Sequence, residues 1–110
     1  MIAVHCENDG VINYLRKMYV EEGCTQPKYH PLSRPARCEA EAVNRMLHIS
    51  AMLGEAPLYI VHLSSKEGLL EVMKAKANHQ KHFAVETCTQ YLTLKDEMYQ
   101  DPQEGLKAIM

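Results

Sequence analysis

The chain has 110 residues, of which 46% are hydrophobic and 24% charged, and a formal net charge of −2. This length suits one modest globular domain. The sequence contains no basic cluster of the kind that binds nucleic acid or an anionic membrane. It also contains no apolar run near the roughly 20 residues that span a bilayer.

The N-terminus and the cysteines predict a cytoplasmic location. The first four residues run directly into His5 and Cys6, so no signal peptide is expected. The four cysteines form no C-x-x-C pair, so neither a disulfide framework nor a zinc knuckle is predicted. They are Cys6, Cys24, Cys38 and Cys88. Cys6 and Cys88 are interpreted as small buried side chains rather than nucleophiles.

Three short apolar segments are predicted to be buried strands. They span residues 2–4, 58–61 and 83–85, and each ends at a polar residue: His5, His62 and Glu86. Near-continuous apolar runs, rather than alternating ones, are typical of parallel strands covered on both faces.

Apolar residues recur at helical spacing between these strands. The first predicted helix starts at Asp9 and ends near Gly23, the second spans about Ala36 to Leu53, and Ser64 or Ser65 caps a third. The first helix presents Val11, Ile12, Leu15, Met18 and Tyr19. The core-facing residues predicted for the second and third helices are Ala40, Val43, Leu47 and Ala51, and Leu69, Leu70, Met73 and Ala77.

The remaining segments are a linker and a C-terminal helix. Residues 23–35 contain three prolines and are expected to be a long linker without regular structure. A last helical stretch is predicted from about Asp96. Strands that alternate with helices indicate an α/β fold of parallel βα units, organised as one block over residues 1–110.

Two histidines occupy equivalent positions, directly after the first and second predicted strands. The carboxyl ends of neighbouring parallel strands lie at one edge of a sheet, so His5 and His62 can converge there. Two neutral imidazoles could bind one Zn²⁺. A strand-end histidine can equally be a hydrogen-bonded core residue, and the spacing alone leaves both interpretations open.

The residues around these histidines resemble those of a known family. His5-Cys6-Glu7-Asn8, Tyr29-His30, Ser33-Arg34-Pro35, the segment 39–45, Tyr59-Ile60-Val61-His62-Leu63-Ser64 and Glu86-Thr87-Cys88-Thr89-Gln90-Tyr91-Leu92 occur in this order. The joint pattern resembles the middle of the dihydropyrimidinase and D-hydantoinase family of the amidohydrolase superfamily, over essentially the whole chain. Thr89 stands where the family usually has proline.

The resemblance implies a (β/α)₈ TIM-type barrel that carries two zinc ions in the complete enzyme, with zinc partial or absent in this segment. A closed barrel typically needs about 250 residues, so the chain is interpreted as a single partial segment, about strands 5–7. Family enzymes open cyclic amides or imides, such as dihydropyrimidines and hydantoins, to N-carbamoyl amino acids. By position, His5 and His62 match two histidines that bind one metal of the pair, and no catalytic residue is assigned to this segment.

Several family residues have no counterpart here, so whether the chain is an enzyme is left open. The H-x-H pair, the carboxylated lysine and the catalytic aspartate lie outside the matched pattern, and the segment is expected to be inactive in isolation. The alternative is a hydantoinase-like interaction or scaffold protein that has lost the full metal site. Glu7, Asn8 and Glu86 could orient the ligands, although Asn8 could equally cap the following helix. Open sheet edges predict a homo-oligomer. The sequence does not indicate which cyclic amide would be the preferred substrate.

Overall fold

The computed structural model describes residues 1–109, which divide into two compact units. The first unit comprises residues 1–8 and 36–88, and the second comprises residues 9–35 together with the chain from Thr89 onward. The first unit contains the sheet and both strand-end histidines. In residues 1–109 no helix combines the length and the apolarity needed to cross a bilayer.

A parallel three-stranded sheet forms the centre of the first unit. Strands β1 (Ile2–Val4), β2 (Leu58–Ile60) and β3 (Phe83–Val85) are ordered β1-β2-β3, and Ala3 pairs with Tyr59, which pairs with Ala84. All three predicted strands are confirmed. Both connections between them pass through a helix, as parallel strands require.

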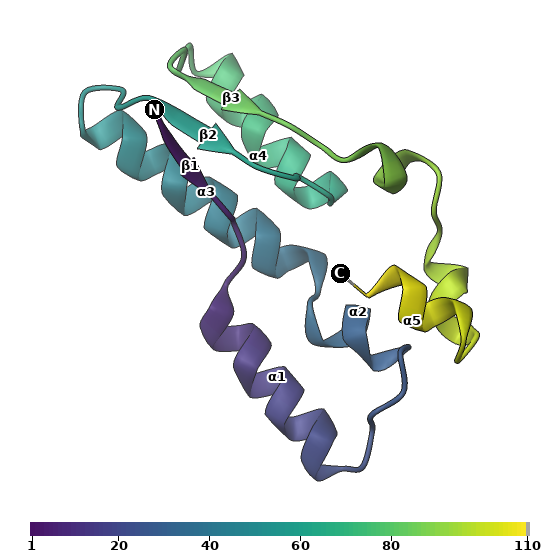
Figure 1. The fold of residues 1–110 in the computed structure, drawn as a ribbon. Coiled ribbons are helices and arrows are strands. Elements are labelled where there is room, and N and C mark those ends of the chain that lie inside the picture. The colour runs from purple at the N-terminus through teal and green to yellow at the C-terminus, as the bar shows by residue number, and fades with distance from the viewer. Residues whose placement is uncertain (110) are drawn as a thin grey trace. The chain divides into compact units, whose positions relative to one another are not determined.

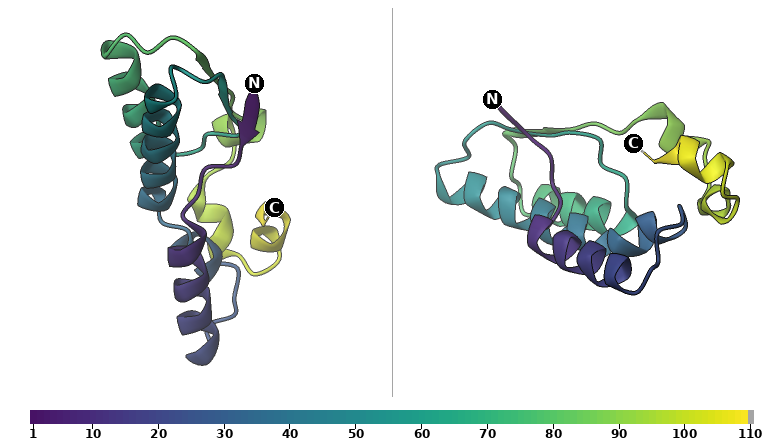
Figure 2. Two further views of the ribbon diagram at one scale, coloured as in Figure 1. Left: turned by 90° about the vertical axis from the view of Figure 1, so that its left-hand side faces the viewer. Right: turned by 60° about the horizontal axis from the view of Figure 1, so that its bottom comes forward.

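Helices α3 (Ala36–Met52) and α4 (Lys66–Ala77) cover one face of this sheet (Figure 1). Figure 2 shows the two helices together on the same side of the strands. Ile60 and Val43 are the largest fully buried side chains of the core between these layers. Burial of such apolar surface is the main force that holds helices onto a sheet. Ala3, Tyr59 and Ala84 occupy the opposite face by strand alternation.

The end of α3 and the start of α4 are each marked by a capping residue. Gly54, just beyond α3, has a φ of +69°, a left-handed conformation that glycine adopts without steric cost. Ser65 is the residue that caps α4, because its hydroxyl accepts a hydrogen bond from the Gly68 N–H at 3.0 Å.

The predicted apolar stripe of α4 is wrong, because these side chains point away from the core. Leu69, Leu70 and Met73 are 45–57% exposed, whereas Gly68 and Val72 are buried. Small residues allow α4 to approach its neighbours closely: a Cβ on Gly68 would lie 2.8 Å from Leu63 Cδ1. The helical periodicity was predicted correctly, but the side of α4 with Gly68 and Val72 packs inward because small side chains fit the space against the core. The remaining member of the predicted stripe, Ala77, is exposed as well.

Two other expectations about burial are corrected in part. On α3, Val43 and Leu47 are buried as predicted, but Ala51 is exposed and Glu39 is buried instead. A carboxylate thus occupies a core position, where it must be hydrogen-bonded. Val11 is also exposed.

The second unit contains helices α1 (Asp9–Glu21), α2 (Tyr29–Ser33) and α5 (Glu104–Ala108) and the 3₁₀ helices η1 (Thr89–Leu92) and η2 (Asp96–Gln100). The linker predicted to lack regular structure therefore holds a short helix, α2. The predicted C-terminal helix is divided between η2 and α5. Thr89 begins η1.

Candidate metal site

His5 and His62 lie next to each other at the carboxyl ends of β1 and β2. His5 Nδ1 is 2.9 Å from His62 Nε2, and the ring centroids are 4.7 Å apart. The side chain of His5 is 55% exposed, so the pair is accessible to solvent. Two imidazole nitrogens from separate strands therefore face the same point.

A bulge in the sheet turns His62 toward His5. The Glu86 N–H donates to the Ile60 carbonyl at 3.0 Å, so in a regular parallel ladder the Glu86 carbonyl would accept from the His62 N–H. It accepts from the Leu63 N–H instead, at 2.8 Å. One extra residue is therefore inserted at His62, and such bulges re-aim a side chain.

The inserted residue, His62, has a strained backbone conformation. Its φ is +41°, in a region that residues with a Cβ seldom adopt. Strict alternation would place His62 on the helix-covered face with Ile60, but Leu63 takes that place and is buried. Strained conformations of this kind persist where the surrounding structure holds them and are concentrated at functional sites.

Glu7 lies beside the other nitrogen of His5. Its Oε2 is 3.0 Å from His5 Nε2, while His5 Nδ1 faces His62. A carboxylate on the far nitrogen fixes the orientation of an imidazole and makes it a stronger ligand. Among the three residues predicted to orient the histidines, Glu7 contacts His5 directly.

Asn8 and Glu86 lie near the histidines but have other partners. The Asn8 side-chain amide donates to Glu41 Oε2 at 2.8 Å, and its backbone N–H donates to the Cys38 carbonyl at 3.1 Å. Glu86 Oε2 accepts a 2.6 Å hydrogen bond from the Tyr59 hydroxyl. Both residues therefore fix the strand ends rather than an imidazole in these contacts.

The short hydrogen bond from Tyr59 to Glu86 affects the protonation of the tyrosine. The bond to the Glu86 carboxylate, more than burial, raises the pKa of the Tyr59 phenol above its ordinary value. Tyr59 is therefore expected to stabilise the fold fully below about pH 10, and this contribution is lost as the pH rises through the higher folded-state pKa.

Glu86→Gln is expected to lower the pKa of Tyr59 toward the ordinary phenol value, because the carboxylate that favours the protonated form is removed. The measurement is the phenolate absorbance difference between each protein and its Tyr59→Phe counterpart, as a function of pH. An unchanged difference titration in Glu86→Gln would assign the shift to another group.

Two of the cysteines, Cys6 and Cys38, are buried thiols. Burial, assisted by the charge of Glu39, raises the pKa of the Cys6 thiol to about 11. Burial also raises the pKa of Cys38. Both thiols stay protonated at neutral pH, so neither is an activated nucleophile. Cys88 is half-buried and, like the other cysteines, unpaired by disulfide.

A buried carboxylate bonded to the chain just after His62 is a feature that was not predicted from the sequence. Glu39, only 6% exposed, accepts hydrogen bonds from the Ser64 and Ser65 N–H groups at 2.8 and 2.6 Å and from the Ser64 hydroxyl at 3.0 Å. The signal was present, because Glu39 lies four residues before Val43 on the buried stripe of α3. A charge at such a position predicts a specific partner in the core.

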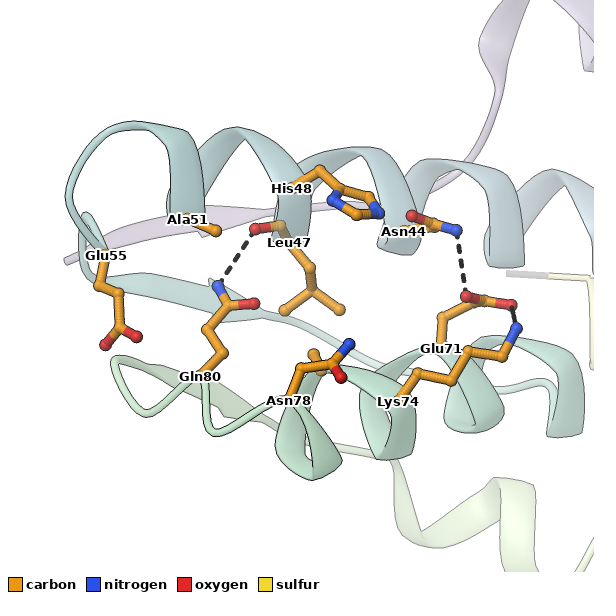
Figure 3. Close-up of a pocket in the computed structure, with 10 residues that line it drawn as sticks. Asn44, Leu47, His48, Ala51, Glu55, Glu71, Lys74, Asn78 and Gln80 are labelled. Carbon is orange, nitrogen blue, oxygen red and sulfur yellow. Dashed lines mark hydrogen bonds and ion pairs between the residues drawn. The ribbon is translucent and has the colours of Figure 1, made fainter.

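A separate hollow between α3 and α4 contains none of the predicted site residues. Asn44 donates to Glu71 at one end, and the Gln80 side chain donates to the Leu47 carbonyl at the other (Figure 3). Lys74 pairs with Glu71 at 2.7 Å. The Asn44–Glu71 bond joins α3 to α4, and the Gln80 bond joins α3 to the chain that follows α4, so these polar groups are explained by helix packing.

Comparison with known proteins gives the context of this histidine pair. No family model matches the chain, but D-phenylhydantoinase of Escherichia coli O1:K1 / APEC is 48% identical over all 110 residues. The chain resembles a segment of the hydantoinase and dihydropyrimidinase proteins. The predicted resemblance is thereby confirmed, and the chain spans 23% of the length of this hydantoinase.

Solved structures give the same result. A D-hydantoinase structure superposes with a TM-score of 0.92 at 46% identity, covering 98% of this chain and 23% of that protein. Dihydropyrimidinase from Brevibacillus agri NCHU1002 gives a TM-score of 0.89 at 38% identity, covering 96% and 23%. The α/β fold with its parallel sheet therefore matches the corresponding segment of these hydantoinase-type proteins.

Proposed function

We propose that this chain is part of a metal-dependent hydrolase that opens cyclic amides, such as dihydropyrimidines or hydantoins, to N-carbamoyl amino acids. The approach of His5 Nδ1 to His62 Nε2, at 2.9 Å, is the observation that carries the proposal. The similarity to D-phenylhydantoinase supports the substrate class. The three strands would be about the fifth to seventh of a (β/α)₈ barrel, within a single partial domain formed by residues 1–110.

The donor set fits zinc as part of a larger site. Two nitrogens bound to one tetrahedral zinc at about 2.0–2.1 Å lie roughly 3.3 Å apart, so these rings need to separate by only a few tenths of an ångström. Among residues 1–109, no group of three or more His, Cys, Asp or Glu side chains is placed to hold a metal. His5 and His62 would therefore supply two ligands, and Glu7 would orient His5.

Bound zinc would polarise the amide carbonyl as a Lewis acid. The residues of this chain would hold the metal and fix the imidazole orientations, and no proton-transfer residue is assigned to them. We therefore propose that the segment alone is inactive as a hydrolase.

Self-association and a cytoplasmic location complete the proposal. The outer strands β1 and β3 each present an unpaired edge within the described part of the sheet, and exposed Leu69, Leu70 and Met73 add apolar surface. Both features favour association with further copies. The free cysteines agree with a reducing compartment.

Zinc binding to the purified chain tests the proposal. At most about one zinc per chain is expected, because this segment supplies only two ligands. Zinc bound to the wild type should bind at least about 100-fold more weakly to the His5→Ala/His62→Ala double variant, because both nitrogen ligands are lost. Zinc content and a competitive chelator titration provide the measurement. The matched control is His79→Ala/His82→Ala, which removes two histidines outside the pair and should retain the metal.

Zinc that persists in the His5→Ala/His62→Ala variant would contradict the proposed site. A wild-type chain that binds no zinc would show that two histidine ligands do not hold the metal without the rest of the site. Zinc lost equally from the control would point to binding by scattered surface histidines.

A further inference from the structure

We propose that residues 38–41, near the start of α3, form a positioning clamp that holds the two strand-end histidines at metal-binding distance. The α3 clamp consists of the Cys38 carbonyl and the carboxylates of Glu39 and Glu41. The inference rests on the proposed function of His5 and His62, and it assigns to the clamp no contact with metal or substrate.

One arm of the clamp fixes the chain that leaves His62. Both Glu39 carboxylate oxygens are used, one by the Ser64 N–H and hydroxyl and the other by the Ser65 N–H. Hydrogen bonds to a charged group are stronger than neutral ones. The backbone two and three residues after His62 is therefore tied to the start of α3.

The other arm fixes the chain that leaves His5. The Asn8 N–H donates to the Cys38 carbonyl at 3.1 Å, and the Asn8 amide donates to Glu41 at 2.8 Å. Arg45 in turn pairs with Glu41 at 3.2 Å. Both histidine loops are thus anchored to a single helical turn, so their separation is set by residues 38–41 and not by the strands alone.

The bulge explains why such an anchor is needed. The left-handed backbone of His62 is unfavourable, and without restraint the loop would relax toward regular pairing, with His62 on the other face of the sheet. Leu63 in the core and the Glu39 bonds hold the loop from the other side. Gly68 permits this arrangement, since a Cβ there would lie 2.9 Å from Glu39 Oε2.

Glu39→Gln in the full 110-residue chain tests the clamp. The substitution preserves shape, but its amide group cannot accept the bond that one carboxylate oxygen now accepts. The metal-free readout is the nuclear Overhauser effect between the His5 and His62 ring protons, which we expect Glu39→Gln to weaken strongly. Zinc affinity should fall about 10- to 100-fold, the usual effect of losing outer partners of metal ligands.

The matched control is Glu71→Gln, which removes a bonded carboxylate from the far hollow between α3 and α4. It should leave both the ring contact and the zinc affinity unchanged. Unfolding curves show whether the two variants lose similar stability. If Glu39→Gln fails to fold, Asn8→Ala tests the other arm through a surface hydrogen bond, with weakening of the ring contact expected.

The outcomes separate the clamp from the proposed function. A ring contact that survives in folded Glu39→Gln, or in Asn8→Ala if the first variant is unfolded, overturns the clamp. An absent ring contact in the wild-type chain overturns it as well. Zinc that persists in the His5→Ala/His62→Ala variant refutes the metal site, and the clamp is then judged by the ring contact alone.

Discussion

Glu39→Ala is expected to lower the free energy of unfolding by about 3–5 kcal/mol, because the Ser64 and Ser65 N–H groups and the Ser64 hydroxyl lose their acceptor. The carboxylate is 6% exposed, so water replaces it poorly, and truncation also leaves a cavity beside Gly68. Domains of this size are only marginally stable, so much of the population should unfold. Urea denaturation followed by circular dichroism measures the change.

Glu41→Ala is the control for this substitution. Glu41 is also a hydrogen-bonded glutamate of α3, but its side chain is 46% exposed. Exposed ion pairs contribute little, so a loss below about 1 kcal/mol is expected. Equal losses in the two variants would show that burial of Glu39 has no special effect on stability.

Ile60→Ala is expected to cost a similar amount, about 3–5 kcal/mol, for a different reason. Ile60 lies on the central strand, is fully buried and packs in the cluster with Val43 and Leu47. Its truncation loses apolar contact and leaves a cavity that surrounding layers fill only partly. The control is Ile2→Ala, since Ile2 is a strand isoleucine that is 64% exposed. A loss of less than about 1 kcal/mol for Ile60→Ala would mean that the core repacks around the cavity.

The elements of the fold could be predicted because their local signals agree with one another. The apolar run before His62, the serine cap at Ser65 and the glycine at Gly54 each mark a boundary that the structure contains. The burial of α4 could not be predicted in this way. Its large apolar residues lie on one stripe and its small ones on another, and only the close approach of Leu63 and Glu39 to Gly68 decides which stripe faces inward.

The candidate site shows the same division. The position of each histidine follows from where its strand ends, and the sequence therefore predicted both members of the pair. Their mutual orientation depends on a one-residue bulge at His62 and on hydrogen bonds that Glu39 accepts from Ser64 and Ser65; Glu39 lies 25 residues before Ser64. Neither leaves a local pattern in the sequence, because both depend on pairing between segments that are distant along the chain.

The backbone at His62 places two selection pressures in opposition. A φ of +41° would suit glycine or asparagine better than histidine, whereas the contact with His5 requires an imidazole. Variants selected only for thermal stability should therefore accumulate glycine or asparagine at this position, while variants selected for metal retention should keep histidine. A saturation library at position 62, sorted separately for thermal stability and for metal retention, would measure these two residue preferences.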